Sequence, residues 1–251
     1  MAPYPVFVVA GAVVGVLAGL FGVGGSAIAT PILAVLGVPG LLAVASPLPA
    51  TIPAALAAAV PYLRAGEAKP RVAGWSLLGA VPATVVGALL SEAIGGPTLL
   101  LASGLVLVLV GAWVVHPLDQ ISEAHEVRWQ HNRGLLVIVM AGVGLFSGLL
   151  ANGGGFLLIP IYLLVFGLQM REAVGTSLLV IAVLTVPTLI THSALGHVDW
   201  TVAGAFAFGM VPAAAISARL SHRISQSALR TAFGWLLIIC GTAFVAYRFM
   251  H

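Results

Sequence analysis

Charged residues are scarce in this chain of 251 residues: only 7% are Asp, Glu, Lys or Arg, while 61% are hydrophobic. Soluble globular domains carry about 25% charged and about 45–50% apolar residues. The shortage of charge therefore excludes a water-soluble domain, and the high hydrophobic content excludes an intrinsically disordered chain. A single cysteine excludes a disulfide scaffold, and the 30 glycines follow no triplet repeat, which excludes collagen. A polytopic membrane protein remains.

Continuous apolar runs, most of them close to 20 residues long, predict an all-α membrane protein. A transmembrane barrel would instead show alternating strands of about ten residues. The basic residues give a net charge of +3 but are scattered through the loops, so they do not indicate nucleic acid binding. The N-terminal segment lacks a basic region and a small-residue cleavage site. We therefore expect it to be retained as the first apolar segment.

The chain contains the same unit twice. Segment 15–26, GVLAGLFGVGGS, precedes Pro31, and segment 144–155, GLFSGLLANGGG, precedes Pro160 at an offset of 129. Later matches share an offset of 130, and they pair Gly66 with Gly196, 81–83 with 211–213, 90–91 with 220–221, Gly104 with Gly234 and Gly111 with Gly241. This shared register indicates an internal duplication. We predict a first repeat over 1–116, a cytoplasmic linker over 117–133 and a second repeat over 134–251, joined in one transmembrane domain.

Each repeat contains five apolar segments, of which the second is too short to cross a membrane. They are 5–21, 26–37, 43–62, 72–92 and 98–115, then 134–150, 155–167, 172–192, 200–218 and 228–247. The short segments span about 18–20 Å, whereas the hydrocarbon core is about 30 Å thick. Each is expected to begin inside the membrane at its glycine cluster. The predicted fold is two inverted repeats, each with a broken-helix hairpin and three spanning helices.

The basic residues decide between parallel and inverted repeats. If the first two segments formed one broken span, the Lys and Arg residues would divide six against four between the two faces. With hairpins, nine of the ten lie on one face and Arg248 alone lies on the other. Positive charge concentrates in cytoplasmic loops, so hairpins are favoured. They predict a multi-pass protein of the cytoplasmic membrane with both termini outside the cytoplasm.

Two hairpin tips that enter from opposite faces are expected to meet and form an anion site. The first N–H groups of a helix have no intrahelical partner, and the helix dipole places about half a positive charge there. Such a site needs no cationic side chain. All seven acidic residues lie in loops or at segment ends, which argues against a cation-coupled pump that uses carboxylates. The candidate binding residues are Gly24, Gly25, Ser26, Asn152, Gly153, Gly154 and Gly155, with Ser46, Thr176 and Ser177 from the third segments.

Alternative roles exist for several of these residues. The hydroxyls of the third segments would equally form hydrogen bonds within or between helices, and the Gly15-xxx-Gly19 pair is expected to pack helices. His116, His125 and His131 fit no zinc spacing, so no metal or cofactor is predicted. A serine hydrolase is the weakest alternative because position 28 lacks the glycine of a nucleophile motif, and no enzyme activity is expected. Cys240 is expected to pack in the last segment.

The doubled glycine motif followed by proline, together with the later segment 173–178, AVGTSL, resembles the sulfite exporter TauE/SafE family over nearly the whole chain. This resemblance implies export of sulfite, or of an organosulfonate such as sulfoacetate, across the cytoplasmic membrane. The expected partners are a small inorganic or organic anion and the lipid bilayer. From the inverted repeat we expect a monomer or homodimer that alternates access by rocking one repeat against the other. An anion channel of the same fold is the alternative. Two positions depart from the family pattern: Ser26 replaces a third glycine, and 45–48 is ASPL where 175–178 is GTSL.

Overall fold

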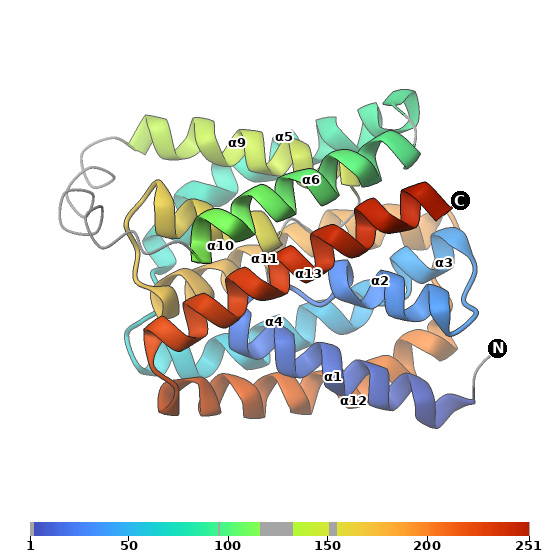
Figure 1. Cartoon of the computed structure of the whole chain (residues 1–251), viewed down its shortest axis with the longest axis horizontal. Coiled ribbons are helices and arrows are strands. Elements are labelled where there is room, and N and C mark those ends of the chain that lie inside the picture. The colour runs from blue at the N-terminus through green and yellow to red at the C-terminus, as the bar shows by residue number, and fades with distance from the viewer. Residues whose placement is uncertain (1–2, 95, 116–132, 151–154, 251) are drawn as a thin grey trace.

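The computed structural model describes residues 3–94, 96–115, 133–150 and 155–250, and within these ranges all regular secondary structure is helical. The long helices lie side by side along one direction (Figure 1). Four described stretches are long and apolar enough to cross a membrane: Tyr4–Phe21, Leu42–Arg64, Met170–Ala194 and Trp200–Arg223. Outward side chains such as Leu109, Ile138 and Phe208 are 70%, 71% and 78% exposed, as a lipid-facing surface requires. The prediction of an all-α polytopic membrane protein is confirmed.

The helices agree with the predicted segments to within a few residues, with one exception. The first half forms α1 Tyr4–Phe21, α2 Ser26–Val35, α3 Gly40–Ala45, α4 Leu48–Arg64, α5 Pro70–Ile94 and α6 Gly96–Val115. The second half forms α9 Arg133–Leu150, α10 Gly155–Leu164, α11 Met170–Ala194, α12 Trp200–Leu220, a 3-10 turn Ser221–Arg223 and α13 Gln226–Met250. The exception is segment 43–62, which is divided between α3 and α4. Pro47 and Pro49 cause this division because they have no N–H to continue the ladder.

Matching positions in the two halves have matching backbone conformations. The short helices α2 and α10 both contain 10 residues, which corresponds to about 15 Å. Gly37 and Gly167, which lie 130 positions apart and follow these helices, have φ values of +86° and +65°. Gly66 and Gly196, which follow α4 and α11, have φ values of +71° and +72°. The duplication found in the sequence therefore extends to the local structure.

Helices of the two halves pack against each other in exchanged pairs. α1 packs along α12, and its counterpart α9 packs along α5, the counterpart of α12. α6 packs on α13, which is its own counterpart in the other half, and α4 likewise packs on its counterpart α11. Glycine makes these approaches close: a Cβ at Gly15 or Gly19 would overlap the α12 backbone, and one at Gly144 would overlap the α5 backbone. These glycines pack helices, as predicted.

The two ends of the bundle are distinct in Figure 1. α1 begins and α13 ends at the same end of the molecule, and α2 runs back toward that end after α1 has entered the bundle. α9 and α10 enter and return at the opposite end, where the α4–α5 and α12–α13 connections also lie. Each half therefore contributes one returning pair of helices, and the two pairs enter from opposite ends.

Candidate functional site

The break between α1 and α2 is a turn that depends on glycine. Gly22 and Gly24 have φ values of +61° and +60°, a left-handed conformation that glycine adopts without strain. The Gly22 N–H donates to a carbonyl of α1 and ends that helix, while the first bond of α2 runs from the Ala29 N–H to the Gly25 carbonyl at 2.8 Å. α1 therefore ends at the predicted glycines, and α2 begins at Ser26. The first N–H groups of α2 have no partner within the helix.

The first break touches the start of α10 inside the bundle. α10 begins at Gly155, and a Cβ at that position would overlap the backbone carbonyl of Val23. Gly24 and Gly155 also both lie against the side chain of Ile181 in α11. Gly25, next in the chain, packs against α12. The structure thus brings together the described glycines of both tips. Asn152, Gly153 and Gly154 lie outside the described residues.

Two side chains from neighbouring helices hold the end of α1 beside the break. The Tyr62 hydroxyl in α4 donates to the Gly19 carbonyl at 3.0 Å. The Ser177 hydroxyl in α11 lies 2.9 Å from the Gly22 carbonyl and 2.9 Å from the Val174 carbonyl. Both donors are fully buried. Ser177 therefore sits at the break, where it binds the backbone of the turn.

Ser46 and Thr176 occupy a different position from the glycine tips. The Ser46 hydroxyl accepts a hydrogen bond from the Asp199 N–H at 3.0 Å, directly before α12. The Thr176 hydroxyl accepts one from the Lys69 N–H at 3.1 Å, directly before α5. The two contacts are equivalent under the repeat, and each joins one half of the chain to the other. These predicted site residues therefore serve the starts of two long helices.

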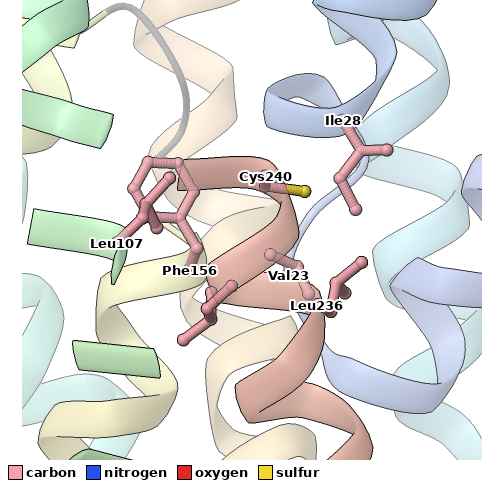
Figure 2. A pocket seen from close by; sticks show the side chains of 7 residues that line it. Val23, Ile28, Leu107, Phe156, Leu236 and Cys240 are labelled. Carbon is pink, nitrogen blue, oxygen red and sulfur yellow. The ribbon is translucent and has the colours of Figure 1, made fainter. Parts of the chain in front are cut away.

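An apolar cavity lies where the two tips meet α6 and α13. Figure 2 shows the side chains of Val23 from the first break and Phe156 from α10 facing this space, with Cys240 of α13 beside them. The cavity is small, with a volume of about 20 Å³, which is room for about one water molecule. The remaining lining residues are Ile28, Leu107, Leu236 and Leu237. Cys240 thus lines a cavity, in addition to the packing role predicted for it.

Sequence reasoning missed a group of charged side chains that joins the halves at one end of the bundle. Lys69 Nζ lies 2.7 Å from Glu172 Oε1, Arg171 Nη1 lies 3.5 Å from Glu67 Oε1, and His222 Nδ1 lies 3.4 Å from Glu67 Oε2. Each pair combines one residue from each half of the chain. The loop positions of these residues were visible in the sequence, but nothing in their spacing indicated the partners.

Histidines occur at the other end of the bundle as well. His192 Nδ1 and His197 Nδ1 lie 3.3 Å apart, where α11 ends. Within the part of the chain that the structure describes, no group of three or more His, Cys, Asp or Glu side chains could hold a metal ion. The histidines of the predicted linker, His116, His125 and His131, lie outside that part.

The chain is similar to curated membrane transporters along nearly its whole length. A probable membrane transporter protein of Xylella fastidiosa strain Temecula1 is 29% identical over 249 residues, which covers 95% of this chain and 93% of that protein. The probable membrane transporter protein YjnA of Bacillus subtilis strain 168 is 26% identical over 248 residues, which covers 92% of this chain and 95% of that protein. No solved structure shows significant similarity to the chain.

The family comparison is consistent with these relatives and with the helical membrane fold. A family model described as sulfite exporter TauE/SafE matches residues 7–244, which is almost the entire chain. This match includes both glycine breaks, both short helices and the exchanged helix pairs. The protein therefore belongs to the sulfite exporter TauE/SafE family and is a multi-pass membrane transporter.

Proposed function

We propose that this protein exports a small sulfur oxyanion (sulfite) or an organosulfonate across the cytoplasmic membrane, as a secondary transporter with alternating access. The observation that carries the proposal is the contact between the two helix breaks at Val23 and Gly155. Irregular backbone at membrane depth is tolerated where it is buried in protein or lines a cavity. Two breaks in contact therefore mark the most favourable place for a substrate. The description of the family supports sulfite as the anion and export as the direction.

Helix electrostatics supports an anion at this contact. α2 and α10 both begin beside it, and each helix start carries about half a positive charge and N–H groups without intrahelical partners. An oxyanion accepts hydrogen bonds from such groups without Lys or Arg. The proposed binding set consists of the two tips, and Ser177 supports the first tip from α11. The residues of the tips are Gly24, Gly25, Ser26, Asn152, Gly153, Gly154 and Gly155.

The apolar cavity beside the tips supports the organosulfonate as an alternative to sulfite. Its described lining is aliphatic and aromatic apart from the Cys240 thiol. A free inorganic oxyanion gains nothing from such a lining, because burial of charge in apolar surroundings is costly. The cavity of about 20 Å³ would have to widen as the helices move. The short hydrocarbon part of an organosulfonate would then lie against Phe156 and Leu107, while its sulfonate group faces the helix starts.

The exchanged pairing of helices supports alternating access. α1 with α12 and α9 with α5 are equivalent pairs, and the two returning pairs of helices enter from opposite ends (Figure 1). An inverted repeat has these properties, and in secondary transporters with inverted repeats the substrate lies near the bilayer midplane. Rocking of one set of helices against the other would open the tips first to one side and then to the other.

Transport by purified protein in liposomes tests the proposal. We expect saturable uptake of radiolabelled sulfite, with counterflow when unlabelled sulfite is preloaded. Sulfate, thiosulfate and a short alkanesulfonate serve as competitors, and they separate an inorganic substrate from an organosulfonate. Preference for a neutral or cationic ligand would overturn the oxyanion proposal. Flux that neither saturates nor shows counterflow would favour an anion channel of the same fold.

The Ser26→Ala variant separates backbone from side-chain recognition in the same assay. The backbone N–H groups of the α2 start remain in this variant, so the half-saturating sulfite concentration should change by less than roughly tenfold, the loss expected for one neutral hydrogen bond. Complete loss of transport in correctly folded protein would contradict recognition by the backbone and would point to a serine-dependent site.

A further inference from the structure

At one end of the bundle, partly buried polar and charged side chains join the two halves. We name this group the Glu67 cluster, and it consists of Tyr62, Glu67, Lys69, Arg171, Glu172 and His222. Glu67 follows α4 and Lys69 precedes α5, whereas Arg171 and Glu172 begin α11 and His222 lies in the turn after α12. The two ion pairs and the contact of His222 with Glu67 therefore all cross between the halves. If the halves move relative to each other, these pairs must separate.

The burial of these charges makes their separation costly. The side chains of Glu67, Arg171 and Glu172 are only 20–23% exposed. Arg171 also donates from Nη2 to the carbonyl of Ile224 at 2.8 Å, which fixes the guanidinium against the turn after α12. Removing one partner of a partly buried pair leaves the other charge poorly solvated. The cluster is thus stable while it is complete and is weakened by the loss of any one charge.

Tyr62 connects the cluster to the helix break. Its ring lies edge-on to the His222 ring, with centroids 5.3 Å apart. Its Cβ packs against Gly175 of α11, where an added Cβ would lie 2.7 Å away. Its hydroxyl donates to the Gly19 carbonyl at the end of α1. One buried side chain therefore touches both the cluster and the helix that leads into the break.

The other end of the bundle lacks an equivalent ion cluster among the described residues. At the repeat offset of 130, Tyr62, Glu67 and Lys69 correspond to His192, His197 and Asp199, while Arg171 and Glu172 correspond to Leu41 and Leu42. The contact between Ser46 and Asp199 is retained there, and leucines occupy the positions of Arg171 and Glu172. The counterpart of His222 is Glu92, whose side chain lies outside the described part of the chain. Among the described side chains, the two ends of the duplicated fold therefore differ in their ion pairs.

From this difference between the two ends we propose that the Glu67 cluster is a gate, which is closed in this structure. The gate separates the break between α1 and α2 from the end of the bundle where the 65–69 and 221–225 turns lie. The proposal rests on the alternating access proposed above but is independent of the identity of the anion. Opening requires the Lys69–Glu172 and Arg171–Glu67 ion pairs to separate, and it releases Tyr62 from His222. Tyr62 transmits this change to α1 through the Gly19 carbonyl.

The single cysteine of the chain provides a native reporter for this gate. Cys240 lines the cavity between Val23 and Phe156 (Figure 2), so a change in its alkylation rate by a reagent added from the side of the cluster reports on opening of that end. The test uses full-length protein in vesicles of known orientation and a membrane-impermeant thiol reagent added from one side. Alkylation of Cys240 is followed by mass spectrometry as a function of time.

We expect Glu67→Gln and Glu172→Gln to raise the alkylation rate from the side of the cluster by roughly tenfold, because each variant leaves a partly buried charge unpaired. Alkylation from the other side should stay unchanged or fall. The double variant with Lys69→Glu and Glu172→Lys restores an ion pair in reverse orientation and should return the rate toward that of the unmodified protein. Arg64→Gln, which removes an exposed charge near the same end, is the matched control and should have no effect.

Three results would overturn the gate. They are an unchanged or undetectable rate in both neutralised variants, an equal increase in Arg64→Gln, and failure of the charge swap to restore slow alkylation. The charge swap also identifies misfolding, because a misfolded protein would remain accessible. Sulfite transport measured in the same vesicles separates this proposal from the function: the alkylation pattern without sulfite transport retains the gate and rejects the substrate. Sulfite transport without the expected alkylation pattern rejects the gate and leaves the proposed substrate in place.

Discussion

At the residue scale, the contact between Val23 and Gly155 leaves no room for a side chain. α10 begins so close to the first break that a Cβ on Gly155 would overlap the Val23 carbonyl and its carbon. Ile181 covers the other side of the same glycine. The residue is therefore required by tertiary packing, and in our proposal it also lets the helix start approach the anion.

Gly155→Ala should disrupt the contact between the tips. Overpacking in a close-packed interior costs about 1–3 kcal/mol, so the midpoint of thermal unfolding in detergent should fall and sulfite transport should be lost. Gly142→Ala in α9 is the matched control, since a Cβ there meets nothing within 4 Å. It should be neutral or slightly stabilising because alanine favours helix more than glycine does. Equal behaviour of the two variants would contradict the contact.

Ser177 illustrates why residue type alone left its role open. Serine in a membrane helix binds a carbonyl of its own helix, a neighbouring helix or a ligand. The Ser177 hydroxyl lies equally close to the Val174 carbonyl in its own helix and to the Gly22 carbonyl in the break. Thr185, further along α11, binds only within its helix, to the Ile181 carbonyl at 2.7 Å. The difference depends on whether a carbonyl of a neighbouring segment lies within reach of the hydroxyl. A single sequence does not show which segments are neighbours.

At the element scale, each half of the chain anchors the start of a long helix in the other half. Ser46 binds the backbone before α12, and Thr176 binds the backbone before α5. Their correspondence was visible in the sequence as a repeat of hydroxyl residues. The partners were not, because they lie 153 and 107 positions away.

Removing one of these hydroxyls should weaken the attachment between the halves. Thr176→Ala leaves the partly buried Lys69 N–H without its partner and should lower the free energy of unfolding by about 1 kcal/mol. Thr176→Ser retains the hydroxyl and should lose less. Thr188→Ala is the control because the Thr188 hydroxyl binds only the Leu184 carbonyl of its own helix. Thermal unfolding in detergent measures all three, and an alanine variant as stable as the control would exclude this role.

The sequence predicted the elements well because hydropathy and helix breaks are local properties. The ends of the apolar runs and the glycine clusters identified both short helices, including the restart points at Ser26 and Gly155. The division between α3 and α4 was the main difference. Prolines in the predicted segment 43–62 indicated kinks, but only the structure locates the division at Ser46 and Pro47.

At the scale of the whole molecule, the distribution of basic residues predicts the orientation. The α4–α5 and α12–α13 connections lie at the end opposite the start of α1 and the end of α13 (Figure 1). Arg64, Lys69, Arg223 and Arg230 are in or next to these connections in the chain. Because positive charge is retained on the cytoplasmic side, we predict that both termini lie outside the cytoplasm. Protease-cleavable tags at each terminus should be cut in intact cells, while a tag in the 65–69 turn should be protected. Termini on opposite sides would exclude the inverted arrangement.

The sequence by itself determined the class of protein, the duplication and the places where helices break. Each of these depends on composition or on residues close together in the chain. Only the tertiary structure decided that the two breaks touch, that Ser46 and Thr176 bind the opposite half, and that Tyr62 joins the Glu67 cluster to α1. These contacts depend on which helix of one half lies beside which helix of the other. That choice is made by close packing at glycines and by partly buried charge pairs between residues far apart in the chain.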